Sequence, residues 1–374
     1  MRTKSGELSV LVEKLTLLAP CLRQLPGTGF EASQKRFQKR YLDFMVNKSS
    51  RDVIVTRSKV IKYLRNFLED RNFLEVETPI LGASVGGAAA RPFITWHNDM
   101  EQELVMRVAP ELYLKQMVVG GFDRVFEIGK LFRNEGIDHS HNPEFTSCEF
   151  YQAYADYYDL MDTTEELFGG MVKELELEPR HGAEVLEFQK PFSRLEFIPS
   201  LESACGTSFP PPSELSSVES FKFLQDLCNK HGVELGNVVT IPRMLDKLMG
   251  KLVEPELTQP TFLLHHPKVM SPLAKQHREV EGLAERFELF VGGKEVANAY
   301  TELNNPDEQR STLLSQANME DPEGMVPDEA FCTSLEYGLP PTAGWGCGLD
   351  RLVMILCNQD HIRDTITFPL QKQL

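Results

Sequence analysis

Two neighbouring segments of this chain can place charged and aromatic side chains on one face of a β-sheet. Residues 125–133 and 144–154 both have strand-like patterns, and alternate residues of a strand share a face. If the two strands pair, that face gathers an arginine, two glutamates and two aromatic rings: Arg133, Glu135, Phe145, Glu149 and Tyr151. The connecting loop adds three hydrogen-bonding side chains: Asn134, His141 and Asn142. These types suit a phosphate and a purine, and the alternative is an ordinary solvated sheet face.

A second set of acidic residues lies in the segment 286–302, which reads RFELFVGGKEVANAYTE and predicts a hairpin around its GG turn. With the residues on either side of GG paired, Glu288 lies opposite Ala297 and shares a face with Glu295. Two such carboxylates suit Mg²⁺ that bridges phosphate oxygens, and the alternative is a pair of surface glutamates. Strict alternation puts three further polar residues on the opposite face: Asn298, Tyr300 and Glu302. One site that uses all five therefore requires a β-bulge or a strong twist.

A third pattern predicts a glycine-rich turn that leads directly into a helix. Residues 344–351 read GWGCGLDR. Glycines at alternate positions let the backbone lie close to a flat ligand. Arg351 then emerges in the first turn of a predicted helix at residues 350–357, where it can reach a terminal phosphate. Alternate glycines alone are a weak signal, whereas this pattern with DR before an apolar helix is much more specific.

The elements that carry these patterns come as runs of strands. We predict strands at residues 7–18, 73–79, 104–108, 125–133, 144–154, 286–291 and 294–303, and a helix at 51–71. Residues 202–252 read as a helical insertion between strands. This order favours an α+β fold, an antiparallel sheet flanked by helices. Neither a GxGxxG fingerprint nor a GxxxxGK[ST] loop occurs in the sequence.

Composition narrows the class of protein. The chain has 374 residues, 41% of them hydrophobic, and a formal net charge of −16. An acidic chain of this kind is not held on nucleic acid by a broad basic surface. The seven cysteines include no CxxC pair, which favours a reducing compartment. No apolar run is long enough to span a bilayer, and the N-terminus lacks the features of a signal peptide.

At these motifs the chain resembles class II lysyl-tRNA synthetases, over residues 40–369. Residues 133–138 (RNEGID) with 141–146 (HNPEFT) resemble the second class motif, and residues 344–351 the third. The helix and strand that end at Pro79 resemble the first motif, which forms a homodimer interface. Residues 298–303 (NAYTEL) are of the lysine type, and residues 146–157 resemble the eukaryotic branch.

The resemblance implies a role for each matching residue. Arg133 and Arg351 are the implied catalytic residues, Arg133 bridging the substrate carboxylate and the α-phosphate and Arg351 meeting the γ-phosphate. The implied ATP contacts are Arg133, Asn134, Glu135, His141, Asn142, Phe145, Glu295, Val296, Gly348 and Arg351, with Phe145 stacked on adenine. Glu288 and Glu295 bind Mg²⁺. The implied lysine contacts are Gly87, Glu111, Arg133, Glu149, Tyr151, Asn298, Tyr300 and Glu302.

The lysine contacts divide by the group they hold. Gly87 and Glu111 take the α-amino group, whereas Glu302 and Tyr151 read the ε-ammonium. Burying that cation requires a paired anion and further acceptors. The resemblance thus implies a lysine–tRNA ligase that forms lysyl-adenylate from lysine and ATP and charges tRNA(Lys).

The front of the chain differs from that family. Residues 1–30 resemble a remnant of the OB-fold anticodon-binding domain and its linker, and residues 31–374 the catalytic domain. We therefore expect tRNA contact through the acceptor stem, a homodimer, no membrane association, and a cytoplasmic location with a mitochondrial one also open. Two alternatives are a ligase that attaches lysine to a protein, as the elongation factor P lysine ligase does, and a truncated regulatory or non-catalytic isoform.

Overall fold

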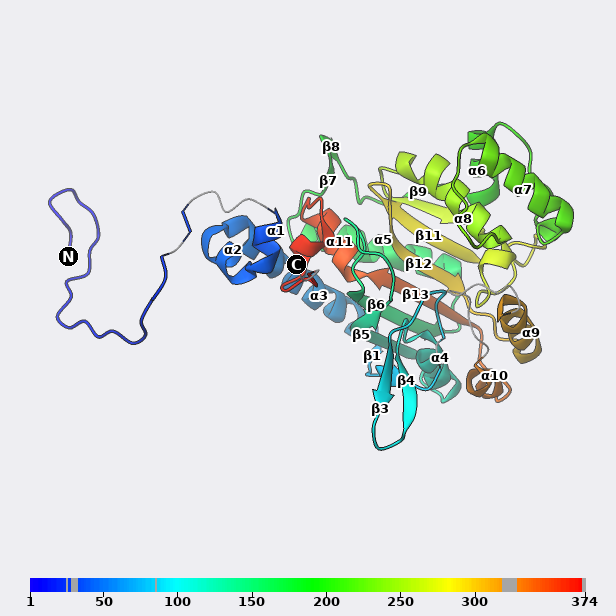
Figure 1. The fold of residues 1–374 in the computed structure, drawn as a ribbon, viewed down its shortest axis with the longest axis horizontal. Helices are drawn as coiled ribbons and strands as arrows, with labels where there is room; N and C mark the ends of the chain where they lie inside the picture. The colour runs from blue at the N-terminus through cyan, green and yellow to red at the C-terminus, as the bar shows by residue number, and fades with distance from the viewer. Residues whose placement is uncertain (25, 28–32, 85, 318–327, 372–374) are drawn as a thin grey trace.

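The computed structural model describes residues 1–24, 26–27, 33–84, 86–317 and 328–371. Its centre is an eight-stranded sheet in the order β1-β5-β6-β13-β12-β11-β10-β9 (Figure 1). The bounds are β1 Leu74–Glu75, β5 Arg124–Phe132, β6 Glu144–Ala153, β9 Ser193–Glu196, β10 Thr261–Leu264, β11 Arg286–Val291, β12 Lys294–Thr301 and β13 Thr342–Gly348. The predicted α+β fold, a sheet flanked by helices with a helical insertion, is confirmed.

The sheet is antiparallel in its middle and parallel at both edges. β1 pairs with β5 in parallel, and so does β9 with β10. The prediction of an antiparallel sheet was wrong at these two pairs. Parallel neighbours need a long crossover, and both pairs have one, because a small sheet and a helix follow β1 and the helical insertion follows β9.

Three helices cover one face of the sheet: α3 Lys48–Glu69, α5 Tyr157–Glu174 and α11 Leu349–Leu356. Their apolar sides form one core with inward residues of the strands. Leu64 of α3 belongs to this core, and the ring of Phe168 of α5 lies 6.2 Å from that of Trp345 of β13. The α5 helix begins at a capping box formed by Asp156 and Asp159. The predicted helix at residues 51–71 is α3, and the one at 350–357 is α11.

Two groups of helices flank the other face at opposite ends (Figure 1). At the β5–β6 end, α4 Glu111–Val119 packs with α10 Glu329–Leu335 and α9 Pro306–Ala317. At the β10–β11 end lies the insertion, with its own core. It comprises α6 Phe197–Cys205, η1 Pro212–Glu214, α7 Val218–Lys230, α8 Ile241–Leu252 and η2 Glu254–Glu256. The sheet between the two groups is the floor of the site described below.

Smaller elements complete the chain. Beside α4, a three-stranded sheet contains β2 Leu81–Gly82, β3 Ile94–His97 and β4 Gln102–Met106, and a two-stranded sheet contains β7 Arg180–His181 and β8 Glu184–Val185. The remaining helices are α1 Ser33–Gln38, α2 Arg40–Val46, η3 Lys268–Met270 and η4 Ile362–Thr365. No helix among the described residues combines the length and apolar character of a membrane span.

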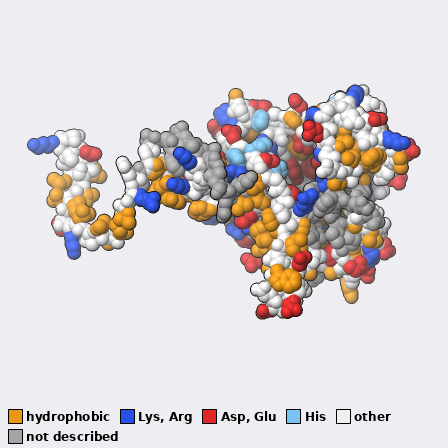
Figure 2. All heavy atoms as spheres, in the orientation of Figure 1, with side chains coloured by type: hydrophobic (Ala, Val, Ile, Leu, Met, Phe, Trp, Pro, Cys, Tyr) orange, Lys and Arg blue, Asp and Glu red, His pale blue; other side chains and the backbone are white. Residues whose placement is uncertain are grey.

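Three local predictions need correction. Residues 7–18 form no strand beyond an isolated bridge between Leu8 and Arg2. Without a partner strand they form no sheet, and their hydrophobic side chains are exposed (Figure 2). The strand expected at residues 73–79 is paired only at Leu74 and Glu75. The glycine-rich residues before α11 are not a turn but the central strand β13.

The predicted division into residues 1–30 and 31–374 remains a prediction. Residues 25, 28–32 and 372–374 within it lie outside the described part of the chain.

Candidate active site

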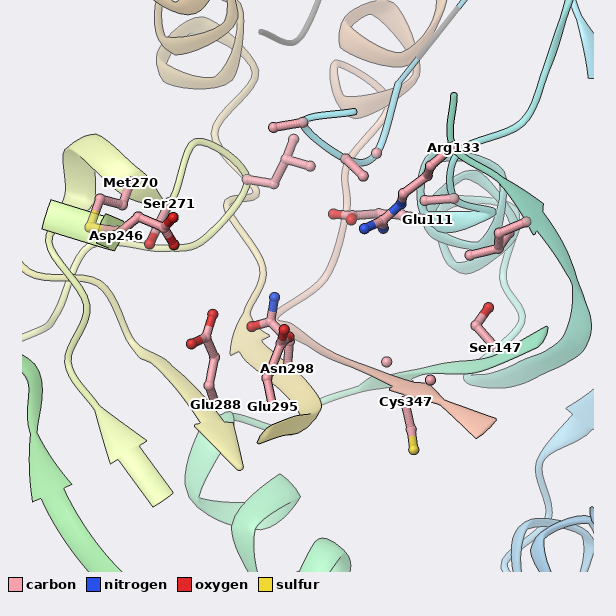
Figure 3. Close-up of a pocket in the computed structure, with 18 of the residues that line it drawn as sticks. Glu111, Arg133, Ser147, Asp246, Met270, Ser271, Glu288, Glu295, Asn298 and Cys347 are labelled. Atoms are coloured by element: carbon pink, nitrogen blue, oxygen red, sulfur yellow. The ribbon is translucent and has the colours of Figure 1, made fainter. Parts of the chain in front are cut away.

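A cavity of about 610 Å³ lies on the sheet face between α4 and the insertion. Figure 3 shows Arg133 and Glu111 on one side of it and Glu288, Glu295 and Asn298 on the other. All but two of the predicted site residues line it: Gly87, Glu111, Arg133, Glu135, His141, Asn142, Phe145, Glu149, Tyr151, Glu288, Glu295, Val296, Asn298, Tyr300, Gly348 and Arg351. The other two are Asn134, which is exposed beside the cavity, and Glu302, which is buried behind its wall.

The β5–β6 ladder has the register that the alternation predicts. Leu131 pairs with Phe145 and Glu127 with Glu149. Arg133 follows the last residue of β5, and its backbone N–H donates to the Pro143 carbonyl at 2.9 Å. Its guanidinium lies 5.2 Å from the centre of the Phe145 ring, and its buried Nε has no hydrogen-bond partner. An arginine with an unused buried donor fits an anionic ligand.

The loop after β5 holds a histidine against Arg351. The Asp138 carboxylate accepts from the backbone N–H groups of Ser140, at 2.7 Å, and of His141, at 2.8 Å. Partial burial would raise the pKa of Asp138, but these bonds and the His141 ring outweigh it and lower that pKa to about 2. His141 Nδ1 lies 2.8 Å from the carboxylate and Nε2 lies 3.2 Å from Arg351 Nη2. Arginine only donates, so His141 Nε2 accepts and Nδ1 carries the hydrogen.

A β-bulge in the β11–β12 hairpin brings the acidic and polar residues to one face. Phe290 pairs with Glu295, whereas Leu289 pairs with Ala297, so Val296 is the extra residue. Both Val296 and Ala297 then point into the core beneath the sheet. The predicted pairing of Glu288 with Ala297 is therefore wrong, since Glu288 pairs with Asn298. The bulge that a single site requires is present, and it places Glu295, Asn298 and Tyr300 on the cavity side.

Glu288 and Glu295 are held by basic groups in this structure. Glu288 accepts from Arg286 at 2.6 Å and lies 3.2 Å from His266 Nε2. Burial would raise the pKa of Glu288, but His266 and Arg286 lower it to about 2. Glu295 lies 3.4 Å from Arg351, and burial and then the Glu288 charge raise its pKa.

The side chains present show whether the site suits the metal that Glu288 and Glu295 imply. The described residues contain no group of three or more His, Cys, Asp or Glu side chains placed to hold a metal. Two carboxylates on one cavity wall suit Mg²⁺, which usually takes one or two carboxylates together with substrate phosphates. The pair therefore fits a Mg²⁺ that arrives with a nucleotide.

Two acids of the insertion were missed by the sequence analysis. Asp246 of α8 and Glu254 of η2 line the cavity across from Glu288. Burial and then the charge of Glu288 raise the pKa of both, that of Glu254 to about 8. No clear signal in the sequence pointed to Asp246, because it lies off the buried side of α8, which is formed by Met244, Leu245, Leu248 and Met249.

Behind the Glu111 end of the cavity lies another residue that was missed, Lys115 of α4. Its ammonium donates to Glu111 Oε1 and to Glu302 Oε2, at 2.7 Å in each case. Tyr300 donates to Glu111 Oε1 at 2.8 Å. Oε1 of Glu302 is buried without a partner. The Glu111–Lys115 spacing of four residues is that of a helical ion pair, which was the available signal.

Comparison with known proteins identifies the family. A family model described as "tRNA synthetases class II (D, K and N)" matches residues 32–372. The chain thus has the fold of a class II aminoacyl-tRNA synthetase catalytic domain.

Curated relatives narrow the class. A lysine–tRNA ligase named cla4 of Cladosporium cladosporioides is 51% identical over 98% of this chain and 64% of its own length. A probable cytoplasmic lysine–tRNA ligase of Encephalitozoon cuniculi is 49% identical over 99% of this chain and 76% of its own. A lysine–tRNA ligase of Aquifex aeolicus is 47% identical, with 99% and 62% covered. The chain belongs to the lysine–tRNA ligase family and spans about two thirds to three quarters of the length of these relatives.

Proposed function

We propose that this chain activates lysine with ATP and transfers it to the 3′ end of tRNA(Lys). The observation that carries the proposal is one cavity with three suitable parts. Arg133 stands on one wall with an unused donor, Glu288 and Glu295 stand on the opposite wall, and a buried carboxylate, Glu302, lies behind the end nearest Glu111.

The first step needs alignment more than proton transfer. A carboxylate oxygen of lysine attacks the α-phosphorus, a new P–O bond forms, and the bond to the bridging oxygen breaks as pyrophosphate leaves. The attacking carboxylate is already anionic, so no general base is needed. Arg133 would hold that carboxylate beside the α-phosphate and stabilise the charge that develops there. Glu288 and Glu295 would hold Mg²⁺ that arrives with ATP, and the ion would supply positive charge to neutralise the phosphates.

The nucleotide has a defined place in this proposal. The adenine ring stacks on Phe145, which Arg133 already covers from one side. Arg351 takes the γ-phosphate, since its guanidinium reaches the cavity between Glu295 and His141. The other proposed ATP contacts are Asn134, Glu135, Asn142, Val296 and Gly348.

Lysine lies at the Glu111 end. Gly87 and Glu111 receive the α-amino group, and Gly87 has a positive φ of 87° where a side chain would press on Glu111. Asn298 helps to hold the carboxylate. Oε1 of Glu302, with Tyr151 and Glu149 beside it, takes the ε-ammonium. An anion with a free buried acceptor offsets the loss of hydration of that cation, and Tyr300 completes the pocket wall.

Lysine-dependent exchange of labelled pyrophosphate into ATP tests the activation step. We expect exchange with lysine and much less with the other standard amino acids. Labelled lysine should then appear on tRNA(Lys). Exchange without charging, together with label on protein, would show that the acceptor is a protein.

The remaining parts of the proposal concern assembly and location. We propose a homodimer through the α3 and β1 region, tRNA contact through the acceptor stem, residues 1–30 as part of an OB-fold domain and its linker, and a cytoplasmic location, as the names of two relatives state for those proteins. Sedimentation equilibrium and imaging of a tagged chain test the dimer and the location.

A further inference from the structure

Lys115 is a buried cation beside a pocket that is proposed to bind a cation. Its side chain has no exposed surface. Its ammonium lies 2.7 Å from Glu111 Oε1, 2.7 Å from Glu302 Oε2, and 5.2 Å from the centre of the Phe331 ring. Burial alone would lower the pKa of Lys115, but the two carboxylates raise it above its ordinary value. Lys115 therefore stays charged.

This ammonium ties together two acids from different elements. Glu111 begins α4, whereas Glu302 directly follows β12. Lys115 binds one oxygen of each carboxylate, and Tyr300 binds the same oxygen of Glu111. In Glu302 the other oxygen, Oε1, is left buried without a partner. The contact thus fixes how far apart the two carboxylates lie and which oxygen of Glu302 is free.

The charge balance of the pocket also requires the Lys115 ammonium. Three carboxylates, Glu111, Glu149 and Glu302, lie in this region, together with one resident ammonium that contacts Glu111 and Glu302. Free lysine brings two more ammonium groups, and its carboxylate goes to Arg133 in the proposed function. The bound pocket is then neutral, as a buried site requires. Without Lys115 one negative charge would remain uncompensated.

We propose that Lys115 is a positioning residue that selects the length of the substrate side chain, because its ammonium fixes the separation of the two carboxylates that receive the α-amino and ε-ammonium groups. The inference rests on the proposed function. A diamino acid that is one methylene shorter, ornithine, cannot reach both carboxylates at the separation that suits lysine. A cation with a purely structural role would affect all substrates alike.

The test compares lysine and ornithine in pyrophosphate exchange. The variants are Lys115→Met, which keeps the side-chain bulk, and Lys115→Gln, which keeps a hydrogen-bond donor without charge. Lys130→Met is the matched control, because Lys130 is 41% exposed and pairs with Glu144 at the surface. Thermal unfolding checks that each variant folds.

In the wild-type chain we expect a preference for lysine of about tenfold or more, the usual range for one methylene. In both Lys115 variants the KM for lysine should rise and this preference should fall by about tenfold, while the KM for ATP stays within about twofold of the wild-type value. Lys130→Met should match the wild type.

A folded Lys115 variant that keeps the wild-type preference for lysine overturns the inference. So does a parallel rise of the KM for lysine and for ATP, since that indicates a structural role. If neither variant folds, the wild-type chain tests the inference. Equal use of lysine and ornithine would contradict a fixed spacing of the two carboxylates, and a preference for lysine would support it. An absence of lysine-dependent exchange in the wild-type chain would instead contradict the proposed function.

Discussion

Arg57 of α3 lies 2.6 Å from Asp350 of α11, the residue immediately before Arg351. Asp350 Oδ2 also accepts from the Thr146 backbone N–H at 2.6 Å, and Arg57 donates to the Thr146 hydroxyl at 3.0 Å. The Asp350 side chain is 2% exposed. This buried group connects the helix beneath the sheet, a central strand and the helix that presents Arg351 to the cavity.

Replacing Asp350 by Asn should weaken both the fold and ATP binding. The substitution leaves the Arg57 charge without its partner, and breaking a buried pair in this way costs about 3 kcal/mol. Because Arg351 follows directly, the KM for ATP should rise more than the KM for lysine. Guanidinium unfolding and pyrophosphate exchange measure the two effects.

The matched control is Lys130→Met, which removes an exposed pair with Glu144 and should cost less than about 1 kcal/mol. If Asp350→Asn loses no more stability than this control, Asp350 does not connect α3, β6 and α11 in the way described.

Glu302→Gln should abolish lysine-dependent exchange and largely keep ATP binding. The amide cannot neutralise the ε-ammonium, and it also leaves Lys115 with one carboxylate instead of two. Loss of one partner from a buried ion pair predicts a rise of about 100-fold or more in the KM for lysine. Glu336→Gln, at the exposed C-terminal end of α10, is the control. Unchanged lysine affinity in Glu302→Gln would refute the role of Glu302.

The raised pKa values of the pocket acids predict pH-dependent lysine binding. Burial raises the pKa of Glu302 to about 8, with Lys115 opposing it and Glu111 adding to it. Burial and then Glu111 likewise raise the pKa of Glu149 to about 8. The tyrosines that face them, Tyr151 and Tyr300, keep their protons in this range.

At pH 7 the empty pocket therefore holds protons that lysine must displace. Lysine affinity should rise with pH up to about 8. Titration calorimetry at pH 7 in buffers of different ionisation enthalpy should show proton release, and the absence of release would contradict this protonation state.

The same pKa values predict the stability of the lysine-free chain. Between about pH 4.5 and 8 the folded chain keeps protons that the unfolded chain has lost. Its free energy of unfolding therefore falls as the pH rises through that window. Denaturant unfolding at several pH values checks the sign, and Glu149→Gln should flatten the slope.

The parts of the site that could be predicted from the sequence are those whose contacts join residues close together in the chain. Alternation placed Arg133 and Phe145 on one face, because a strand has a strict period of two and the loop fixed which strands pair. The bulge at Val296 could be stated only as a condition, since the extra residue is set by packing beneath the sheet. Lys115 was missed because its contact with Glu302 joins residues 187 positions apart.

Gly344 tests the packing around the free oxygen of Glu302. A Cβ at this position would collide with Glu302 Oε1 and would lie 2.5 Å from Tyr151 Cε1. Both neighbours are buried, so the carboxylate would have to turn away from the proposed ε-ammonium site. Gly344→Ala should therefore raise the KM for lysine by about tenfold, the effect of a displaced charged partner, with little change in the KM for ATP.

Gly346→Ala is the matched control on the same strand. A Cβ there would meet Glu149 Cγ at 3.4 Å, an ordinary van der Waals contact. Its KM for lysine should stay close to the wild-type value, because no group of the proposed ε-ammonium site has to move. Equal effects of the two substitutions would mean that β13 tolerates neither side chain for general reasons. Wild-type lysine affinity in Gly344→Ala would mean that Glu302 Oε1 does not receive the substrate.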